Sequence, residues 1–373
     1  ETDRVLTNDE LATLVDTSDE WIRQRTGIVE RRIVREGEST FTLALEAAQA
    51  AVDVADLDPA HLDLIIVATI TPEHFIPATA CLVQDALGAD RAAAFDLSAG
   101  CSGFVYGMSL AADLLISGTY DHALVVGAET LSRIIDWTDR GTCVLFGDGA
   151  GAVVLQATET PGGIISTVLG SDGSGGDLLI QPAGGSAHPP SAETLANRLH
   201  YVQMEGREVF RFASRIMPEA SREVLEKAHL SVEDVALFVP HQANNRILQA
   251  SARGLGVPED RMFTNLSRYG NTSAASVPIA LCEAIDEGRI KRDDLIVAVG
   301  FGAGLTWAAA AIRWSLPVPV ASPPRRITFW RSLRYRLAQA RSRWRRTWRR
   351  VDAWLFRSYN DRSRGSKRGS EDE

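Results

Sequence analysis

The chain contains two similar halves, and this internal repeat limits its fold more than any other feature of the sequence. The matches, in chain order, join residues 63–67 to 234–239, residues 90–91 to 260–261 and residues 125–127 to 298–300, at offsets of 170 to 173 positions. Several matches in one order at nearly one offset indicate two copies of a single structural unit.

Each half alternates short β-branched runs with longer segments suited to helices. The predicted buried strands are residues 64–68, 123–127, 236–239 and 295–299, and two predicted helices are residues 107–117 and 218–228. Pro218 would then stand in the first turn of its helix, where proline is tolerated. This alternation predicts a layered α/β protein with a largely parallel sheet, divided into halves at residues 1–160 and 161–315. We expect a functional site at the seam where equivalent loops of the two halves meet.

Residues 295–312 form an uncharged stretch of 18 residues, which is the lower limit for a membrane-spanning helix. Three glycines, at positions 300, 302 and 304, interrupt it. We therefore interpret this stretch as two buried strands joined by a glycine loop.

The charge of the chain divides it into an acidic body and a basic C-terminal segment. The net charge of −9 combines 16 basic and 5 acidic side chains in residues 316–373 with 23 basic and 43 acidic ones in residues 1–315. Residues 316–326 predict a proline-rich linker. Residues 327–373 predict a basic amphipathic helix with a polar tail, in which Trp330, Trp344 and Trp348 lie among many arginines.

This predicted helix suits an anionic membrane surface, which tryptophan and arginine side chains bind well. A protein partner is the next alternative, followed by a solvated, mostly disordered tail. Nucleic acid is the least favoured alternative.

One cysteine stands out among the four in the chain. The cysteines show no CxxC or metal-site spacing, which favours free thiols in a reducing compartment. The glycine-rich runs do not complete a GxGxxG pattern, so no dinucleotide site is predicted. Cys101 lies 170 positions before Asn271, so the two occupy equivalent places after a strand and before a small-residue helix. The positive end of a helix dipole favours a thiolate at such a position.

His241 follows the predicted strand at residues 236–239, at the strand end where α/β proteins place active sites. With Cys101 and Asn271 it forms a plausible catalytic set. Taken singly, each of the three could be a small core residue, a structural histidine or a turn residue. The repeat favours the catalytic interpretation.

The body, from about Asp3 to Ser315, resembles β-ketoacyl-acyl carrier protein synthase III, a condensing enzyme of the thiolase-like superfamily. The matching motifs are TSDEWI at 17–22, RTGI at 25–28, DLSAGCSGF at 96–104, RGT at 140–142, FGDGAGA at 146–152, PHQAN at 240–244, YGNTS at 269–273 and GFGAGLTW at 300–307. The resemblance implies a five-layered αβαβα arrangement of two duplicated halves. The first strand of the first half is expected to be missing, because the match begins late.

The resemblance also implies a mechanism, in which Cys101 takes an acyl group from a short acyl-CoA such as acetyl-CoA. The backbone N–H groups of Cys101 and Ala303 would form an oxyanion hole. His241, which should be neutral, and Asn271 would stabilise the enolate formed as malonyl-acyl carrier protein loses CO2. No cofactor and no metal are expected. A cytoplasmic location is expected, with a possible peripheral association at the inner face of the membrane.

Further residues are assigned by the same resemblance. Trp21 and Arg140 would sandwich the adenine of CoA, with Thr17 and Arg25 nearby. The predicted lining of the pantetheine tunnel is Gly206, Phe210, Ala243 and Asn244. Arg211 and Arg246 would contact the acyl carrier protein, and Ile76 would reach the acyl pocket of the partner in a homodimer. Two alternatives are a related starter or long-chain condensing enzyme of polyketide or secondary lipid pathways, and an inactive scaffold that presents the basic tail.

Overall fold

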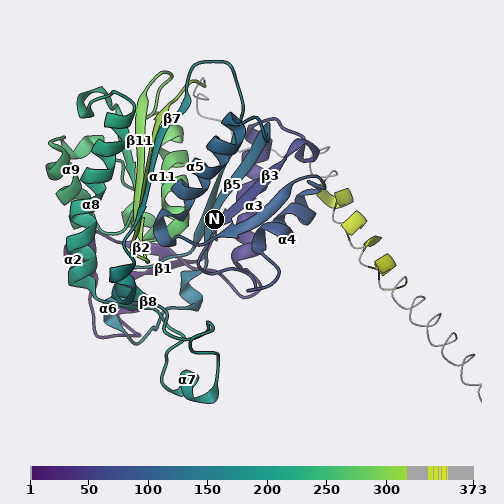
Figure 1. Ribbon diagram of the computed structural model, residues 1–373. Helices are drawn as coiled ribbons and strands as arrows, with labels where there is room; N and C mark the ends of the chain where they lie inside the picture. Colours follow the sequence, from purple (N-terminus) through teal and green to yellow (C-terminus); the bar gives the residue numbers. More distant parts are fainter. Residues whose placement is uncertain are drawn as a thin grey trace, which may run out of the picture.

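The computed structural model describes residues 2–316 and part of a C-terminal helix (Figure 1). The described residues of that helix are 335–338, 340–342, 344–345, 347–349 and 351. Nearly all of the predicted linker at 316–326, and much of the segment predicted as a helix and tail at 327–373, therefore lie outside the described residues.

Residues 2–156 contain a four-stranded sheet with the strand order β4-β3-β5-β6. Its strands are β3 (Leu64–Ala68), β4 (Ala93–Leu97), β5 (His122–Glu129) and β6 (Gly149–Gln156). β3 runs parallel to both β4 and β5, whereas β6 is antiparallel to β5.

A second four-stranded sheet has the order β10-β11-β12-β7. Its strands are β7 (Gly163–Ser171), β10 (Leu237–Pro240), β11 (Leu295–Gly302) and β12 (Thr306–Arg313). β10 is parallel to β11, and the other pairs are antiparallel. In the second sheet β12 pairs with both β11 and β7. In the first sheet β6 pairs only with β5 among the described residues. The boundary proposed between residues 160 and 161 falls in the connection from β6 to β7.

The register of the two sheets confirms the duplicated fold. Leu64 of β3 lies opposite Ala123 of β5, and Leu237 of β10 lies opposite Ile296 of β11. Corresponding members of these pairs are 173 positions apart, which is the largest offset found in the sequence repeat. Strand pairing therefore repeats residue by residue between the halves.

Helices and sheets form five layers, with the two sheets separated by a central helical layer (Figure 1). α3 (Thr40–Val54) and α4 (Thr79–Leu87) cover the outer face of the first sheet. α5 (Gly103–Ile116) and α11 (Ser276–Asp286) lie between the sheets. α8 (Gly206–Lys227) and α9 (Asn245–Leu255) cover the outer face of the second sheet. The predicted αβαβα arrangement is confirmed.

Side-chain alternation along each strand explains why helices cover both faces. Leu64 and Ile66 of β3 join the apolar cluster of the central layer, while Ile65 and Val67 join the cluster under α3 and α4. Because successive side chains of a strand point to opposite faces, a strand that is apolar throughout must be covered on both sides.

The uncharged stretch at residues 295–312 forms β11, a glycine turn and β12, as its glycines predict. No helix among the described residues is both long enough and apolar enough to span a membrane.

The predicted start of the helix at Pro218 is wrong. Pro218 lies well inside α8, which begins at Gly206. The preceding turns bury Val209, Phe212 and Ala213, and this apolar face stabilises the helix although proline cannot donate a backbone hydrogen bond.

Short elements connect the sheets and the longer helices. They are β1 (Val5–Thr7), α1 (Asn8–Leu11), α2 (Asp19–Thr26), β2 (Glu30–Arg32), α6 (Arg140–Cys143), β8 (Leu179–Ile180), α7 (Ala192–Ala196), β9 (Gln203–Met204) and α10 (Leu266–Tyr269). α2 has clear local signals, because the Ser18 hydroxyl accepts from the Trp21 N–H at 3.2 Å and Gly27 ends it with a φ of +83°.

Candidate active site

Cys101 lies at the entrance to the central helix α5, just after β4. Residues Gly100–Ser102 form a 3₁₀ turn that leads directly into α5. The cysteine side chain is only 6% exposed. Cys101 therefore lies at a helix N-terminus, as predicted, but its thiol is buried.

A turn of the second half approaches Cys101 closely. A Cβ atom at Gly302 would collide with the backbone nitrogen of Cys101, and one at Gly100 would lie 2.6 Å from the backbone nitrogen of Ala303. Only glycine allows the two backbones to come this close, and Gly100 also has a φ of +55°. The N–H groups of Cys101 and Ala303, predicted as an oxyanion hole, thus lie on adjoining turns.

His241 follows the end of β10 and is held there by two hydrogen bonds. Its backbone N–H donates to the Val299 carbonyl at 2.7 Å, and its Nδ1 lies 2.5 Å from the Ser276 hydroxyl. Nε2 is buried without a hydrogen-bond partner in the described part of the chain. Burial lowers the pKa of His241 to about 3, so the ring is neutral near pH 7.

Asn271 has its amide oriented by the following residues. Its Oδ1 accepts the backbone N–H of Ser273 at 2.8 Å, and its own backbone is paired with Leu145 and Gly147. With Oδ1 occupied in this way, the Nδ2 hydrogens are the donors that Asn271 offers to the cavity.

Cys101, His241 and Asn271 line one narrow channel of about 90 Å³, together with Phe301 and Gly302. The tunnel residues predicted from sequence, Gly206, Phe210, Ala243 and Asn244, also line this channel. The structure therefore brings together residues from both halves of the repeat, as the seam predicts.

A second cavity of about 170 Å³ lies on the other side of Cys101. Its lining is mostly apolar and includes Leu131, Ile134 and Val202. Cys101, Phe146 and Leu179 border both cavities, so the thiol stands between the channel and an apolar pocket.

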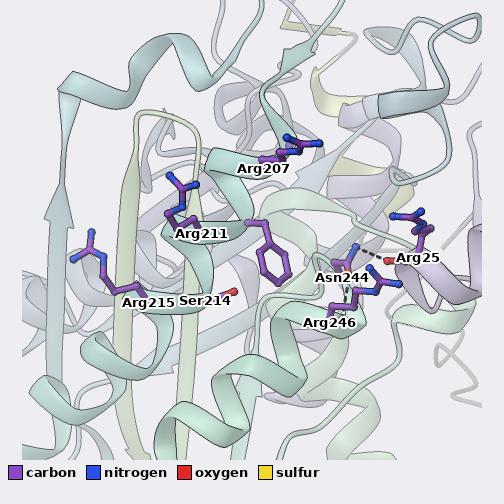
Figure 2. A pocket seen from close by; sticks show the side chains of 9 residues that line it. Arg25, Arg207, Arg211, Ser214, Arg215, Asn244 and Arg246 are labelled. Atoms are coloured by element: carbon purple, nitrogen blue, oxygen red, sulfur yellow. Dashed lines mark hydrogen bonds between the residues drawn. The ribbon is translucent and has the colours of Figure 1, made fainter.

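The outer end of the channel adjoins a basic pocket, the mouth, with which it shares Gly206, Phe210 and Asn244. Figure 2 shows the side chains that line the mouth. Arg207, Arg211 and Arg215 follow one another at intervals of four along α8, and Arg25 and Arg246 lie on the opposite side. Arg211 forms an exposed ion pair with Glu208 at 2.8 Å. Sequence analysis identified Arg211 but missed Arg207 and Arg215, although their spacing of four was a readable signal.

Asn244 connects this mouth to α2. It caps α9 by accepting the Arg246 N–H at 2.9 Å, and its side-chain amide donates to the Arg25 carbonyl at 3.2 Å. Arg246 in turn donates to the Gln24 carbonyl at 3.0 Å. These bonds hold α2 against α9 on one side of the mouth.

The Trp21 indole ring and the Arg140 guanidinium lie against each other and leave no gap for the predicted adenine ring. The Arg140 guanidinium is 4.9 Å from the centre of the indole ring, and Arg25 stands 5.8 Å from the same ring. A flat base sandwiched between them would need about 7 Å, twice a contact distance. Thr17, expected nearby, has a buried hydroxyl without a hydrogen-bond partner in the described part of the chain.

Burial changes the expected state of the nucleophile. Loss of hydration raises the pKa of the Cys101 thiol to about 12, although a hydrogen bond with the Ser273 side chain lowers it. The helix position alone therefore does not leave a thiolate at rest, contrary to the sequence-based expectation, because the cost of burying the charge is larger.

Ile76 stands apart from these cavities. It is 89% exposed and does not line the apolar pocket of its own chain. Sequence analysis gave no role to Ser276, Ser273 or Glu129, which lie around the catalytic set. Ser273 stands in the YGNTS motif, whereas no local motif marks the other two.

A buried cysteine, a neutral histidine and an asparagine, gathered from two similar halves in a five-layered fold, define a condensing enzyme of the thiolase-like class. The chain belongs to the β-ketoacyl-acyl carrier protein synthase III family. The sequence models for 3-oxoacyl-[acyl-carrier-protein] synthase III and for its C-terminal part match residues 95–173 and 225–314.

Similar proteins support this assignment over most of the chain. A β-ketoacyl-[acyl-carrier-protein] synthase III of Symbiobacterium thermophilum is 56% identical over 312 residues, which cover 84% of this chain and 94% of that one. A relative from Caldanaerobacter subterraneus is 54% identical, with 84% and 95% covered. The crystal structure of 3-oxoacyl-[acyl-carrier-protein] synthase III from Aquifex aeolicus has a TM-score of 0.78 at 50% identity, with 84% and 96% covered.

Proposed function

We propose that this chain condenses a short acyl-CoA with malonyl-acyl carrier protein to give 3-oxoacyl-acyl carrier protein, CoA and CO2. The observation that carries this proposal is the meeting of Cys101, His241 and Asn271 between an apolar pocket and a basic mouth. Acetyl-CoA suits the pocket of about 170 Å³ as the first acyl donor to test.

In the first half-reaction, Cys101 attacks the thioester carbon and CoA leaves. The acyl chain then occupies the apolar pocket behind the thiol, and the N–H groups of Cys101 and Ala303 face the carbonyl oxygen on which negative charge develops. The close approach of the two turns supports this role, because it fixes both donors in advance.

In the second half-reaction, malonyl-acyl carrier protein loses CO2 and its enolate attacks the acyl group on Cys101. We assign His241 Nε2–H and Asn271 Nδ2–H as donors to the thioester oxygen of the enolate. The Ser276 hydroxyl, 2.5 Å from Nδ1, would donate to that nitrogen and leave the ring proton on Nε2. These steps use acyl-CoA and malonyl-acyl carrier protein as substrates and involve no cofactor.

Acylation and decarboxylation should separate in variants. Mass spectrometry after incubation with acetyl-CoA and longer acyl-CoAs should find one acyl group on Cys101. His241→Ala and Asn271→Ala should still acylate, while malonyl decarboxylation falls by about 10²- to 10³-fold, because each removes an enolate donor. Absence of an adduct with every acyl donor would contradict the enzyme assignment and favour the inactive scaffold. A preference for long acyl groups would favour the related long-chain enzymes.

The two substrates should depend on different arginines, the carrier protein on arginines of the mouth and CoA on Arg140 beside Trp21. We propose that Arg211 and Arg246 receive the acidic carrier protein, and that Arg140 swings away from Trp21 to admit the adenine of CoA near Thr17 and Arg25. An acidic body would otherwise repel an acidic carrier, so a local basic patch is needed.

Arg246→Glu should therefore raise KM for malonyl-acyl carrier protein about tenfold and weaken its salt dependence, with KM for acetyl-CoA little changed. Arg140→Ala should instead raise KM for acetyl-CoA and leave KM for malonyl-acyl carrier protein little changed. Arg292→Glu, an exposed position far from the mouth, serves as the charge-matched control. Equal effects of Arg246→Glu and Arg292→Glu on carrier-protein KM would contradict the assignment.

We also propose a homodimer that pairs through β4. β4 is an edge strand of the first sheet, and its Phe95 is exposed together with the neighbouring Phe75 and Ile76. An uncovered apolar edge invites pairing with another strand, and a second copy of this chain offers an identical one. Ile76 would then close the acyl pocket of the partner.

Phe95→Glu should convert the dimer to a monomer in sedimentation velocity, because it places a charge in the apolar interface. Ile165→Glu changes an equally exposed apolar residue on β7 and should leave the dimer intact. A wild-type chain that sediments as a monomer at micromolar concentration would rule the dimer out.

The described C-terminal residues dock on the first half beside α4 (Figure 1). Arg341 and Arg345 both form ion pairs with Asp90, at 2.6 and 3.0 Å, and Ser342 hydrogen-bonds to Asp85. Tyr335 packs in the apolar cluster under α3 and α4 and donates to Asp53 at 3.1 Å. One face of the helix is thus held by the body.

A different face of the same helix stays exposed and apolar. Leu337, Trp344 and Trp348 are 59%, 64% and 58% exposed, and the two indole rings stack at 5.8 Å between centres. We propose that this face lies on an anionic membrane, so that the enzyme works at the cytoplasmic surface. The basic surplus of residues 316–373 supports this, since each basic residue near such a surface contributes about 1 kcal/mol.

Binding to vesicles should depend on both charge and tryptophan. The full chain should co-sediment with phosphatidylglycerol vesicles and not with phosphatidylcholine vesicles, and deletion of residues 316–373 should abolish this. Trp344→Ala with Trp348→Ala should weaken binding about tenfold or more, whereas Leu195→Ala, an exposed apolar residue on α7, should not. Co-sedimentation that survives the deletion would contradict the membrane proposal.

A further inference from the structure

Arg31 is a fully buried arginine to which the proposed mechanism gives no role. It is the middle residue of β2 and has no solvent exposure. Its Nη1 donates to the Asn8 side-chain oxygen at 2.8 Å and to the Leu6 carbonyl at 3.3 Å, and its Nη2 donates to the Val144 carbonyl at 2.9 Å. Nε is buried without a hydrogen-bond partner in the described part of the chain.

The guanidinium of Arg31 is an unfavourable group to bury at this place. The three acceptors that hold it in the described structure are neutral oxygens, and none is a carboxylate. Burial lowers the pKa of Arg31 to about 10, which leaves the group charged near pH 7. A buried charge without an opposite charge beside it costs free energy, and an apolar side chain that packs well in its place is often as stable. An arginine here therefore indicates a requirement other than packing.

Two segments, residues 144–147 of the first half and residues 269–271 of the second, meet beside the site, and we call this contact the Asn271 joint. The Asn271 N–H donates to the Leu145 carbonyl at 2.8 Å, and the Gly147 N–H donates to the Asn271 carbonyl at 3.0 Å. These two bonds fix the backbone from which the Asn271 side chain extends into the channel.

Arg31 contacts both segments of the Asn271 joint. Its Nη2 hydrogen bond ends on Val144, in the first segment. A Cβ atom added at Gly147 would lie 3.1 Å from the Arg31 Cβ, and one added at Gly270 would lie 3.5 Å from it. The Gly147 Cβ would also collide with the Tyr269 carbonyl, so the two segments touch where Arg31 packs against them.

We propose that Arg31 is a positioning residue for the condensation step, which holds the Asn271 joint and so sets where the Asn271 amide donates to the enolate. Arg31 lines neither the channel nor the apolar pocket, and it therefore acts through the joint. Acylation uses Cys101 and the oxyanion donors and does not use the Asn271 amide. The inference rests on the condensing function proposed above.

The experiment measures the two half-reactions separately in Arg31 variants. Single-turnover mass spectrometry follows acylation of Cys101 by acetyl-CoA, and CO2 release follows decarboxylation of malonyl-acyl carrier protein. Arg31→Met keeps the length of the side chain without its donors, and Arg31→Lys keeps the charge without the fork that reaches both Asn8 and Val144. Both should leave acylation little changed and lower decarboxylation about 10- to 100-fold, because a donor displaced by about 1 Å loses that much.

A double variant tests whether Arg31 acts through Asn271. In an Asn271→Ala chain the displaced donor is already absent, so Arg31→Met should lower decarboxylation by no more than about twofold further. A further loss as large as the one that Arg31→Met causes in the wild-type chain would overturn the proposal, because Arg31 would then act on another group.

Two control variants separate this role from a general loss of stability. Arg261→Met removes an arginine that also donates to a backbone carbonyl, that of Glu233 at 3.1 Å, away from the joint. Val224→Ala removes buried apolar atoms of α8 and should lower the melting temperature. Both should keep the wild-type ratio of decarboxylation to acylation. A fall of this ratio in Val224→Ala equal to that in Arg31→Met would overturn the proposal.

Asn8→Ala tests the same role with Arg31 in place, since it removes the side-chain acceptor of Nη1. It should lower decarboxylation in the same direction and by less than Arg31→Met. Unchanged decarboxylation in folded Arg31→Met, or in Asn8→Ala where the Arg31 variants do not fold, would overturn the proposal. Either result, with the acetyl adduct on Cys101 still formed, would leave the condensing function standing. Failure of all acyl donors to form an adduct in the wild-type chain would instead reject the condensing function.

Discussion

The close approach of two glycine turns, one from each half of the chain, holds the catalytic centre together. The turn at Gly100 and Cys101 meets the turn at Gly302 and Ala303 so closely that a side chain at either glycine would collide with backbone. This contact places backbone N–H donors from both halves beside one site. The duplicated sheets, the five layers and the channel that reaches Cys101 are arranged around this contact.

Burial at this seam sets the protonation of the whole site. The same loss of hydration raises the pKa of the Cys101 thiol and of Glu129 and lowers the pKa of His241, so each group is biased to its neutral form. A neutral histidine suits donation to an enolate, but a neutral thiol must lose its proton before it can act.

Sequence reasoning worked where a residue carries its own local signal. Cys101, His241 and Asn271 each follow a strand or precede a small-residue helix, and the repeat relates the first to the third. The helix start predicted at Pro218 was wrong. The buried apolar face that includes Val209 and Phe212 stabilises the helix before the proline, and this outweighs the preference of proline for a first helical turn. Ser276 and Glu129 had no signal, since each contacts the site through a hydrogen-bond partner on another element, 35 and 144 positions away. Arg207 and Arg215 had a spacing signal that was overlooked.

The sequence by itself determined the duplicated α/β fold, which residues of the two halves meet at the seam, and the division into an acidic body and a basic C-terminal segment. Strand periodicity, the repeat and the charge can all be read directly from the order of the residues. The tertiary structure decided three further things. They are the protonation states at the seam, the closed contact between Trp21 and Arg140, and the docking of the C-terminal helix beside Asp90. These depend on distance and burial among residues far apart in the chain, and no local pattern encodes either quantity.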